Sequence, residues 1–151
     1  YANKDEEPFM PFLPEFTSHV WNLLLKVSAH PKHDRLAAIG IKFLAGLVGK
    51  EMHRAVFKEE AALRQIISNI VVPNLKIREV DEERFEDDPQ EFILSDIEGS
   101  ESESRRKCSQ ELLRAMCRQF EAESTGICLE HIQNMIAEFS ADPASKWAAK
   151  D

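Results

Sequence analysis

Apolar residues recur along most of the chain at the three- and four-residue spacing of amphipathic helices. This spacing predicts helices over about 15–27, 34–48, 59–72, 101–120 and 125–139, with a short connecting turn over 51–57. Pro14 suits the first turn of the first helix, Asp34 is expected to be the N-cap of the second, and Pro73 is expected to end the third. Asp142 and Pro143 predict the start of a further helix. No run with the two-residue period of a strand competes, so the pattern predicts an all-α protein.

The second predicted helix carries a candidate core stripe and two glycines. The stripe consists of Leu36, Ile39, Phe43 and Leu47, and it is widened by Ile41, Leu44 and Val48. A glycine inside a helix costs about 1 kcal/mol in helix propensity relative to alanine. Gly40 and Gly46 therefore predict a close approach of a neighbouring helix.

The spacing of the helices indicates a repeat. The first helices of successive antiparallel pairs begin near residues 15, 59 and 125, at intervals of 59 − 15 = 44 and 125 − 59 = 66. Two-helix HEAT-type repeats run about 40–47 residues, so the second interval fits if about 20 residues are inserted between its two helices. We therefore expect an α-solenoid of antiparallel helix pairs, and the alternative is a six-helix bundle of unrelated topology. The expected division is a first repeat over 1–57, a second over 58–122 with an acidic insertion over about 73–103, and the start of a third over 123–151.

The net negative charge of the chain is concentrated in the expected insertion. Residues 79–103 contain twelve Asp and Glu and one basic residue, Arg84, so this segment carries −11 and the remainder +3 of the net charge of −8. No helical pattern runs through it beyond one expected turn near 90–97. Large apolar residues lie among the charges, which is unusual for a solvated linker: Leu75, Ile77, Val80, Phe85, Phe92, Ile93, Leu94 and Ile97. We predict a tethered segment whose apolar residues dock while its carboxylates face a partner or water, and the alternative is a mobile acidic loop without a partner.

The acidic segment supplies the candidate site residues. The carboxylates expected to contact a partner are Glu79, Asp81, Glu82, Glu83, Glu86, Asp87 and Asp88, together with Glu91. The side chains expected to anchor the segment are Asp96, Glu98, Arg105 and Arg106.

Composition excludes several classes of function. An isoelectric point near 5.2 argues against a general nucleic-acid or anionic-membrane binder, and no apolar run reaches the roughly 18 residues that span a bilayer. Cys117 and Cys128 lie on apolar helical faces, so we expect buried free thiols and a reducing compartment. No nucleotide-binding, hydrolase or metal-ligand motif is present, so no enzymatic activity, catalytic residue, cofactor or metal is expected. Because the chain begins at Tyr1 without Met, we expect it to be a piece of a longer protein.

Several motifs resemble the importin-β superfamily of nuclear transport receptors, and within it the receptors that re-export importin-α. The resemblance is carried by Val72–Leu75, Asp81–Glu83, Phe85–Asp87, Glu91–Ile93, Asp96–Ser100 and Arg105–Arg106. It extends in the same order to Trp21–Leu24, Ile41–Ala45, Phe120–Glu121, Thr125–Ile127, Trp147 and Lys150–Asp151.

The resemblance implies a HEAT-repeat export receptor that binds importin-α together with Ran-GTP, shuttles between nucleus and cytoplasm, and contacts nuclear pore proteins. It also implies that the long insertion takes part in the open–closed switch of the receptor. Two alternatives remain: a HEAT-repeat scaffold or adaptor whose acidic loop captures a basic protein, and an acid-loop chaperone that binds many basic proteins.

Overall fold

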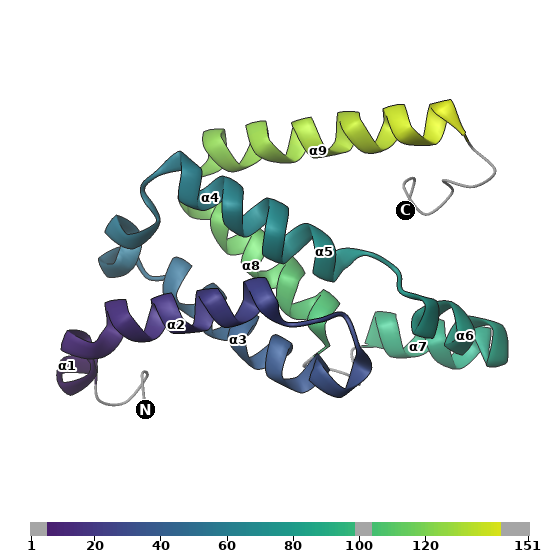
Figure 1. Ribbon diagram of the computed structural model, residues 1–151, viewed down its shortest axis with the longest axis horizontal. Coiled ribbons are helices and arrows are strands. Elements are labelled where there is room, and N and C mark those ends of the chain that lie inside the picture. The colour runs from purple at the N-terminus through teal and green to yellow at the C-terminus, as the bar shows by residue number, and fades with distance from the viewer. Residues whose placement is uncertain (1–5, 99–103, 143–151) are drawn as a thin grey trace.

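The computed structural model describes residues 6–98 and 104–142 (Figure 1), and every regular element in these ranges is helical. The prediction of an all-α protein is therefore confirmed. The Asp142–Pro143 helix start and Trp147 involve residues outside the described ranges. The elements, in chain order, are α1 (Glu6–Phe9), η1 (Met10–Phe12), α2 (Leu13–Lys26), η2 (Pro31–His33), α3 (Asp34–Val48), η3 (Glu51–Phe57), α4 (Glu60–Ile66), η4 (Ile67–Val71), α5 (Val72–Leu75), α6 (Glu79–Asp87), α7 (Pro89–Glu98), α8 (Arg105–Gln119) and α9 (Glu121–Ala141).

The main helices stack in two layers. One layer contains α2, the rod formed by α4, η4 and α5, and α9, and α9 packs on α4 and η4. The other contains α3 and α8, which pack side by side and make the most extensive helix contact among the described residues. Each of α3 and α8 also packs on a helix of the first layer, α3 on α2 and α8 on the rod. This arrangement of successive helix pairs is the one expected for a solenoid.

The core lies between the two layers, and α3 faces it differently from the prediction. Leu36 and Ile39 are 46% and 52% exposed, so half of the predicted stripe lies on the surface. The buried face consists of Ala37, Ala38, Gly40, Ile41, Leu44, Leu47 and Val48. Small residues occupy this face because α3 must approach both α2 and α8 closely.

The helix predicted over 59–72 does not end at Pro73. It continues through a π-helical turn, η4, into α5, which includes Pro73 and ends at Leu75. Proline has no N–H to donate, and its ring crowds the carbonyl four residues earlier. The wider π turn ends at Val71, two residues before Pro73, and gives room for that ring, so the rod passes through the proline.

Helix boundaries differ from the predictions in three other places. Asp34 is the first residue of α3 rather than its N-cap, which is His33. Helix α8 begins at Arg105, after Ser104, whose hydroxyl accepts a hydrogen bond from the Lys107 amide. Helix α9 begins at Glu121 rather than near residue 125, because the single residue Phe120 turns the chain between α8 and α9.

None of the three cysteines, all of which lie in the described residues, forms a disulfide, but two are less buried than predicted. Cys108 on α8 is buried, whereas Cys117 and Cys128 are half-buried. Burial, with a smaller effect of the neighbouring Cys117, raises the pKa of Cys128 above its usual value. A raised pKa keeps this thiol protonated and lowers its reactivity.

The two glycines of α3 give a matched test of close packing. A Cβ atom on Gly40 would lie 3.1 Å from Cδ2 of Leu24, whereas one on Gly46 would meet nothing within 4 Å. We expect Gly46→Ala to stabilise the chain by about 1 kcal/mol through helix propensity. Gly40→Ala should gain less or lose stability, because the buried Leu24 side chain must shift. Urea unfolding of both variants measures the difference, and an equal gain at the two positions would contradict the close contact at Gly40.

Candidate functional site

The acidic segment forms a helical hairpin made of α6 and α7, which corrects the prediction of a mostly non-helical loop. The first turn of α6 begins with acidic residues, which complement the positive end of a helix dipole. The Asp81 carboxylate accepts a hydrogen bond of 3.0 Å from the backbone N–H of Arg78. The Asp88 carboxylate accepts one of 2.9 Å from the N–H of Glu91 and so caps α7, which starts at Pro89.

An aromatic pair joins the two helices of the hairpin. The rings of Phe85 on α6 and Phe92 on α7 meet edge to face, with centroids 5.7 Å apart and planes at 85°. Phe85, Ile93 and Leu94 are nevertheless 46%, 46% and 52% exposed. These three apolar residues therefore do not dock the segment on the body of the protein, contrary to the prediction.

Most of the predicted contact carboxylates lie on the surface of the hairpin. Seven of them are exposed: Glu79, Glu82, Glu83, Glu86, Asp87, Asp88 and Glu91. Asp81 differs, because its side chain is only 15% exposed and is bound to Arg78. Asp96 and Glu98 lie in the last turns of α7, and their side chains are outside the described part of the structure.

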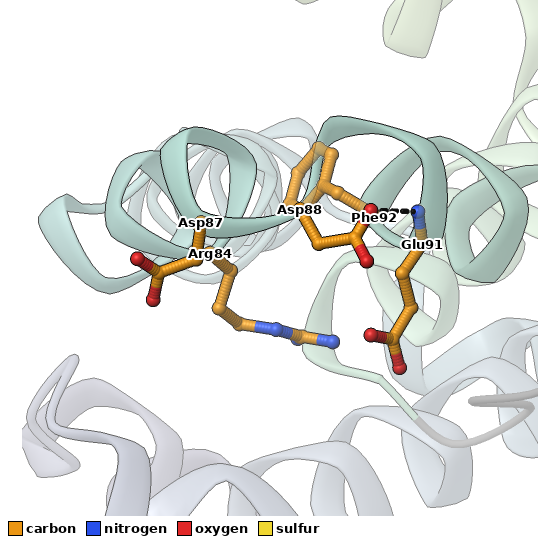
Figure 2. Close-up of a pocket in the computed structure, with 5 residues that line it drawn as sticks. All are labelled: Arg84, Asp87, Asp88, Glu91 and Phe92. Carbon is orange, nitrogen blue, oxygen red and sulfur yellow. Dashed lines mark hydrogen bonds between the residues drawn. The ribbon is translucent and has the colours of Figure 1, made fainter.

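A small pocket opens between the two helices of the hairpin (Figure 2). It is lined by Arg84, Asp87, Asp88, Glu91 and Phe92 and has a volume of about 210 Å³. The Arg84 guanidinium and the Glu91 carboxylate extend toward the same space, while the Asp87 carboxylate points away from Arg84. The pocket therefore combines groups of both charges with the apolar ring of Phe92.

The hairpin is fastened to the rest of the protein by a group of ion pairs centred on Asp34. Arg78 binds this carboxylate through two nitrogens, with Nη1–Oδ1 at 2.8 Å and Nη2–Oδ2 at 3.2 Å. Arg105 Nε lies 2.7 Å from the same Oδ1. One carboxylate thus holds the start of the hairpin and the start of α8 on α3. We call Asp34, Arg78, Arg105 and Asp81 the anchor.

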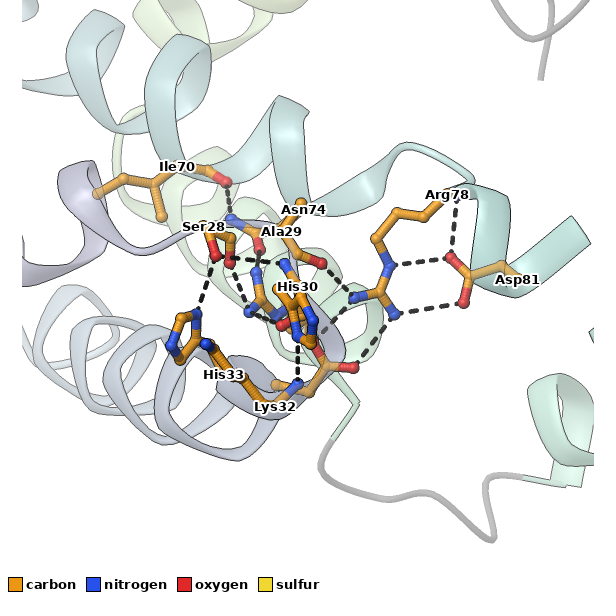
Figure 3. Close-up of polar contacts among 11 residues, drawn as sticks. Ser28, Ala29, His30, Lys32, His33, Ile70, Asn74, Arg78 and Asp81 are labelled. Carbon is orange, nitrogen blue, oxygen red and sulfur yellow. Dashed lines mark hydrogen bonds and ion pairs between the residues drawn. The ribbon is translucent and has the colours of Figure 1, made fainter.

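Arg105 is the buried member of the anchor, with 6% of its side chain exposed. Its Nη2 donates to the backbone carbonyls of Ser28 at 2.9 Å and His30 at 3.4 Å, and its Nη1 donates to Asn74 Oδ1 at 3.3 Å. The Asn74 amide in turn donates to the Ile70 carbonyl at 2.7 Å, in the π-helical turn (Figure 3). Arg105 therefore joins α8 to the α2–α3 turn and to the rod.

Arg78 also bonds within its own segment. Its Nε donates to Asp81 Oδ2 at 3.1 Å and its Nη1 to the Ala29 carbonyl at 3.1 Å (Figure 3). Burial lowers the pKa of Arg78, but the bonds to Asp34 and Asp81 outweigh it and raise the pKa above its ordinary value. For Arg105 burial dominates and lowers the pKa, although Asp34 opposes the change.

The anchor predicts that the free energy of unfolding depends slightly on pH. Burial alone would raise the pKa of Asp81, but the hydrogen bonds and charge of Arg78, with the charge of Arg106, hold it below its usual value of about 4. A group whose pKa is lowered by folding stabilises the fold above its unfolded pKa and loses that contribution as the pH falls through the folded value. We expect Asp81→Asn to cost about 1 kcal/mol at neutral pH and nothing in acid. Urea unfolding at neutral pH and below pH about 3 measures this, and an equal loss at both pH values would contradict it.

Comparison with known proteins decides the family. The family model described as Cse1 matches residues 1–151, the whole chain. The chain belongs to the Cse1 family. It is 37% identical to exportin-2 of Danio rerio and of Drosophila melanogaster and 36% identical to exportin-2 of Homo sapiens, over 151 residues in each case. These alignments cover all of the chain and 16% of each exportin-2.

A solved member of the Cse1 family shares the fold. The structure of the exportin Cse1 in its cargo-free, cytoplasmic state matches with a TM-score of 0.91 and 35% identity, over 97% of this chain and 16% of that one. The predicted α-solenoid and the predicted resemblance to nuclear transport receptors are therefore confirmed. This Cse1-family chain spans about one sixth of the length of the relatives it matches.

Sequence reasoning missed the centre of the anchor. Asp34 was expected to cap a helix, and Arg105 was expected to bind the acidic segment, whereas it binds Asp34 and the α2–α3 turn. The charge of Arg106 makes a small contribution to the lowered pKa of Asp81 in the hairpin. The partners of Arg105 lie 31 to 77 residues away in sequence, so no local motif could identify them.

The described residues contain neither a candidate metal cluster nor a candidate membrane-spanning helix. Within 6–98 and 104–142, no group of three or more His, Cys, Asp and Glu side chains is placed to hold a metal ion. Among the same residues, no helix has the length and apolar character that crossing a membrane requires. The relatives are exportins, which are transport receptors rather than enzymes.

Proposed function

We propose that this chain is an internal segment of a nuclear export receptor that binds importin-α together with Ran-GTP and returns importin-α to the cytoplasm. The observation that carries the proposal is the match to exportin-2 along the complete chain. In this proposal the receptor shuttles between nucleus and cytoplasm and contacts pore proteins, and the segment itself catalyses nothing. Residues 1–57, 58–122 and 123–151 would be one repeat, a second repeat containing the hairpin, and the start of a third.

The α6–α7 hairpin is proposed as the part of this segment that contacts a partner and biases the receptor between open and closed shapes. Its two helices pack on each other, and the anchor holds its first residues on α3. A unit joined in this way can change position through a few polar contacts. A partner that binds one position of the hairpin better than the other shifts the receptor toward that shape.

The exposed carboxylates Asp87, Asp88 and Glu91 give a direct test of partner contact. Replacing all three with Lys in the receptor that carries this segment is expected to weaken importin-α binding in the presence of Ran-GTP. Each exposed ion pair contributes about 0–1 kcal/mol, so three together give a loss of up to about 100-fold. A titration of importin-α with Ran-GTP, Ran-GDP or no Ran measures the change. Glu15, Glu123 and Glu138 are exposed on α2 and α9, and their replacement with Lys is the matched control.

The same titration tests the receptor assignment separately. Binding of importin-α that requires Ran-GTP supports an export receptor, even if the triple variant binds normally. Importin-α binding that ignores the nucleotide on Ran would contradict it. Unchanged affinity and unchanged receptor shape in the triple variant would remove the proposed role of these three carboxylates.

A further inference from the structure

The second half of α9 carries an apolar stripe that the described part of the protein leaves largely uncovered. Ile132 and Ile136 are 45% and 58% exposed, and Cys128 and Met135 are half-buried. These four residues follow one another at the spacings of one side of a helix. Among the described residues of α9, none after Ile127 is buried. We call Cys128, Ile132, Met135 and Ile136 the α9 stripe.

The α9 stripe does not face the rod. Ser68 Oγ on η4 lies 2.8 Å from Nε2 of His131, so His131 marks the side of α9 that faces the rod. Successive residues are about 100° apart around a helix, so Ile132 points about 100° away from that side. Cys128, at the start of the α9 stripe, has Cys117 of α8 as its neighbour. The stripe therefore lies on the side of α9 that faces the layer of α3 and α8.

The order of helices in the fold indicates what covers this side. In the two preceding pairs, a helix of the first layer is followed in the chain by a helix of the second layer that packs on it. These pairs are α3 on α2 and α8 on the rod. Helix α9 is the third helix of the first layer, and Figure 1 shows its second half diverging from the rod. The same order predicts a second-layer helix from the residues that follow Asp142.

The sequence after α9 is suited to such a helix. Asp142–Pro143 has the same two residues as Asp88–Pro89, where the Asp88 carboxylate caps α7 and the helix starts at the proline. Ala144, Trp147 and Ala148 then lie at helical spacing, so a helix that begins at the proline has one apolar side. This side offers a large ring and two small residues to the exposed isoleucines of α9.

A second copy of the chain is a weaker candidate for covering the α9 stripe. From Cys128 to Ile136 the stripe extends 8 × 1.5 Å, about 12 Å, on a helix about 10 Å wide. A stable interface between separate proteins buries about 800 Å² on each partner, which is far more than this stripe offers. A helix in the same chain avoids the loss of translational and rotational freedom on association and has a high effective concentration.

We propose that the α9 stripe is the docking surface for the helix that begins at Pro143, which returns antiparallel along α9 in the layer of α3 and α8. This inference rests on the proposed function, because it takes the chain to be a segment of a longer receptor. It adds the face of α9 on which the third repeat is built. Ile136 lies 142 − 136 = 6 residues before the turn, so it should face the position 142 + 6 = 148, close to Trp147 and Ala148.

Photo-cross-linking in the full receptor tests the proposal. p-Benzoylphenylalanine replaces Ile136, the receptor is irradiated, and mass spectrometry of its peptides identifies the linked residues. The expected cross-link joins position 136 to Trp147 or Ala148. In the matched control the same amino acid replaces Ala137, which is exposed on α9 and points about 100° away from Ile136. The control should not link to these two residues.

The other outcomes of the cross-linking overturn the proposal. They are a link from position 136 to a second copy, to importin-α, to Ran or to another part of the receptor, equal linking from positions 136 and 137, and no link at all. The experiment needs no Ran-GTP, so its result is separate from the importin-α titration. Importin-α binding that requires Ran-GTP, without the link, contradicts this inference alone. The link in a receptor that ignores the nucleotide on Ran contradicts the proposed function alone.

Hydrogen exchange of Trp147 variants in the full receptor gives a second measurement. Trp147→Ala removes the largest side chain proposed to cover the α9 stripe, so the amides over 129–141 are expected to exchange about tenfold faster. Trp147→Phe keeps a large ring and should restore most of the protection. Unchanged exchange over 129–141 in Trp147→Ala would overturn the proposal.

Discussion

Leu112→Ala is expected to lower the free energy of unfolding by about 3–4 kcal/mol. Leu112 is fully buried in the middle of α8, the helix that packs on α3, on α5 and on the π-helical turn η4. Truncation removes buried methyl groups and leaves a cavity, since helices on several sides hinder collapse of the site. Urea unfolding followed by circular dichroism measures the loss, and an unchanged m-value would show that the compactness of the two states is unaltered.

Leu129→Ala is the control with the same chemistry on the surface. Leu129 lies on α9 and is 51% exposed, so its truncation should change stability by no more than about 0.5 kcal/mol. Comparable losses in the two variants would contradict the placement of the core around α8.

The pattern of apolar residues predicted the helices because their spacing is a local property. Helices α2 and α3 lie within a few residues of the expected ranges, and η3 occupies the expected connection over 51–57. The pairing of helices could also be predicted, since the chain order and the interval between the first two pairs limit which helices can be neighbours. These are the parts of the fold that depend on short stretches of sequence.

The direction in which a helix faces depends on its neighbours, and here the prediction failed in part. In α3 the large residues Leu36 and Ile39 suggested one core face, but the neighbouring helices select the face that contains Ala37, Ala38 and Gly40. Closely packed helices favour small residues at their contact, and a search for large apolar side chains does not detect these residues.

The prediction that the acidic segment is mostly non-helical was wrong, because it gave more weight to the net charge of the segment than to its local helix-start signals. The sequence contains an Asp followed by Pro at residues 88 and 89, which is a recognised helix start, and carboxylates at the beginning of α6. Repulsion between exposed carboxylates is screened by water and salt, so it does not prevent two short helices that are capped and joined by the Phe85–Phe92 pair.

The anchor could not be predicted from the sequence, because its ion pairs join residues that are distant along the chain. Arg78 and Asp34 are 44 residues apart. Only the packed arrangement of α3, α8 and the rod brings both arginines to the same carboxylate. The acidic composition of the segment identified the candidate carboxylates of the hairpin. The anchor, which positions the hairpin, can be identified only from the fold.

Asp34→Ala is expected to destabilise the chain by about 3 kcal/mol. Removing one partner of a buried ion pair costs about 3–5 kcal/mol, since the other charge is left without compensation. The lower end of that range applies because the Asp34 side chain is 36% exposed and water partly replaces it, whereas Arg105 is 6% exposed. The hairpin should also loosen at its Arg78 end. The backbone amides of the hairpin over 79–94 should then exchange hydrogen faster than the backbone amides of α3.

Two further variants distinguish the effect of the Asp34 charge from the effects of its side-chain shape and of its position in the anchor. Asp34→Asn keeps the volume and one acceptor oxygen, so it should lose nearly as much stability if the charge is what compensates Arg105. Glu82→Gln removes an exposed carboxylate from α6 and should change the free energy of unfolding by no more than about 0.5 kcal/mol. If Asp34→Ala is as mild as Glu82→Gln, or if exchange in the hairpin is unaltered, the carboxylate of Asp34 does not hold the hairpin on the solenoid.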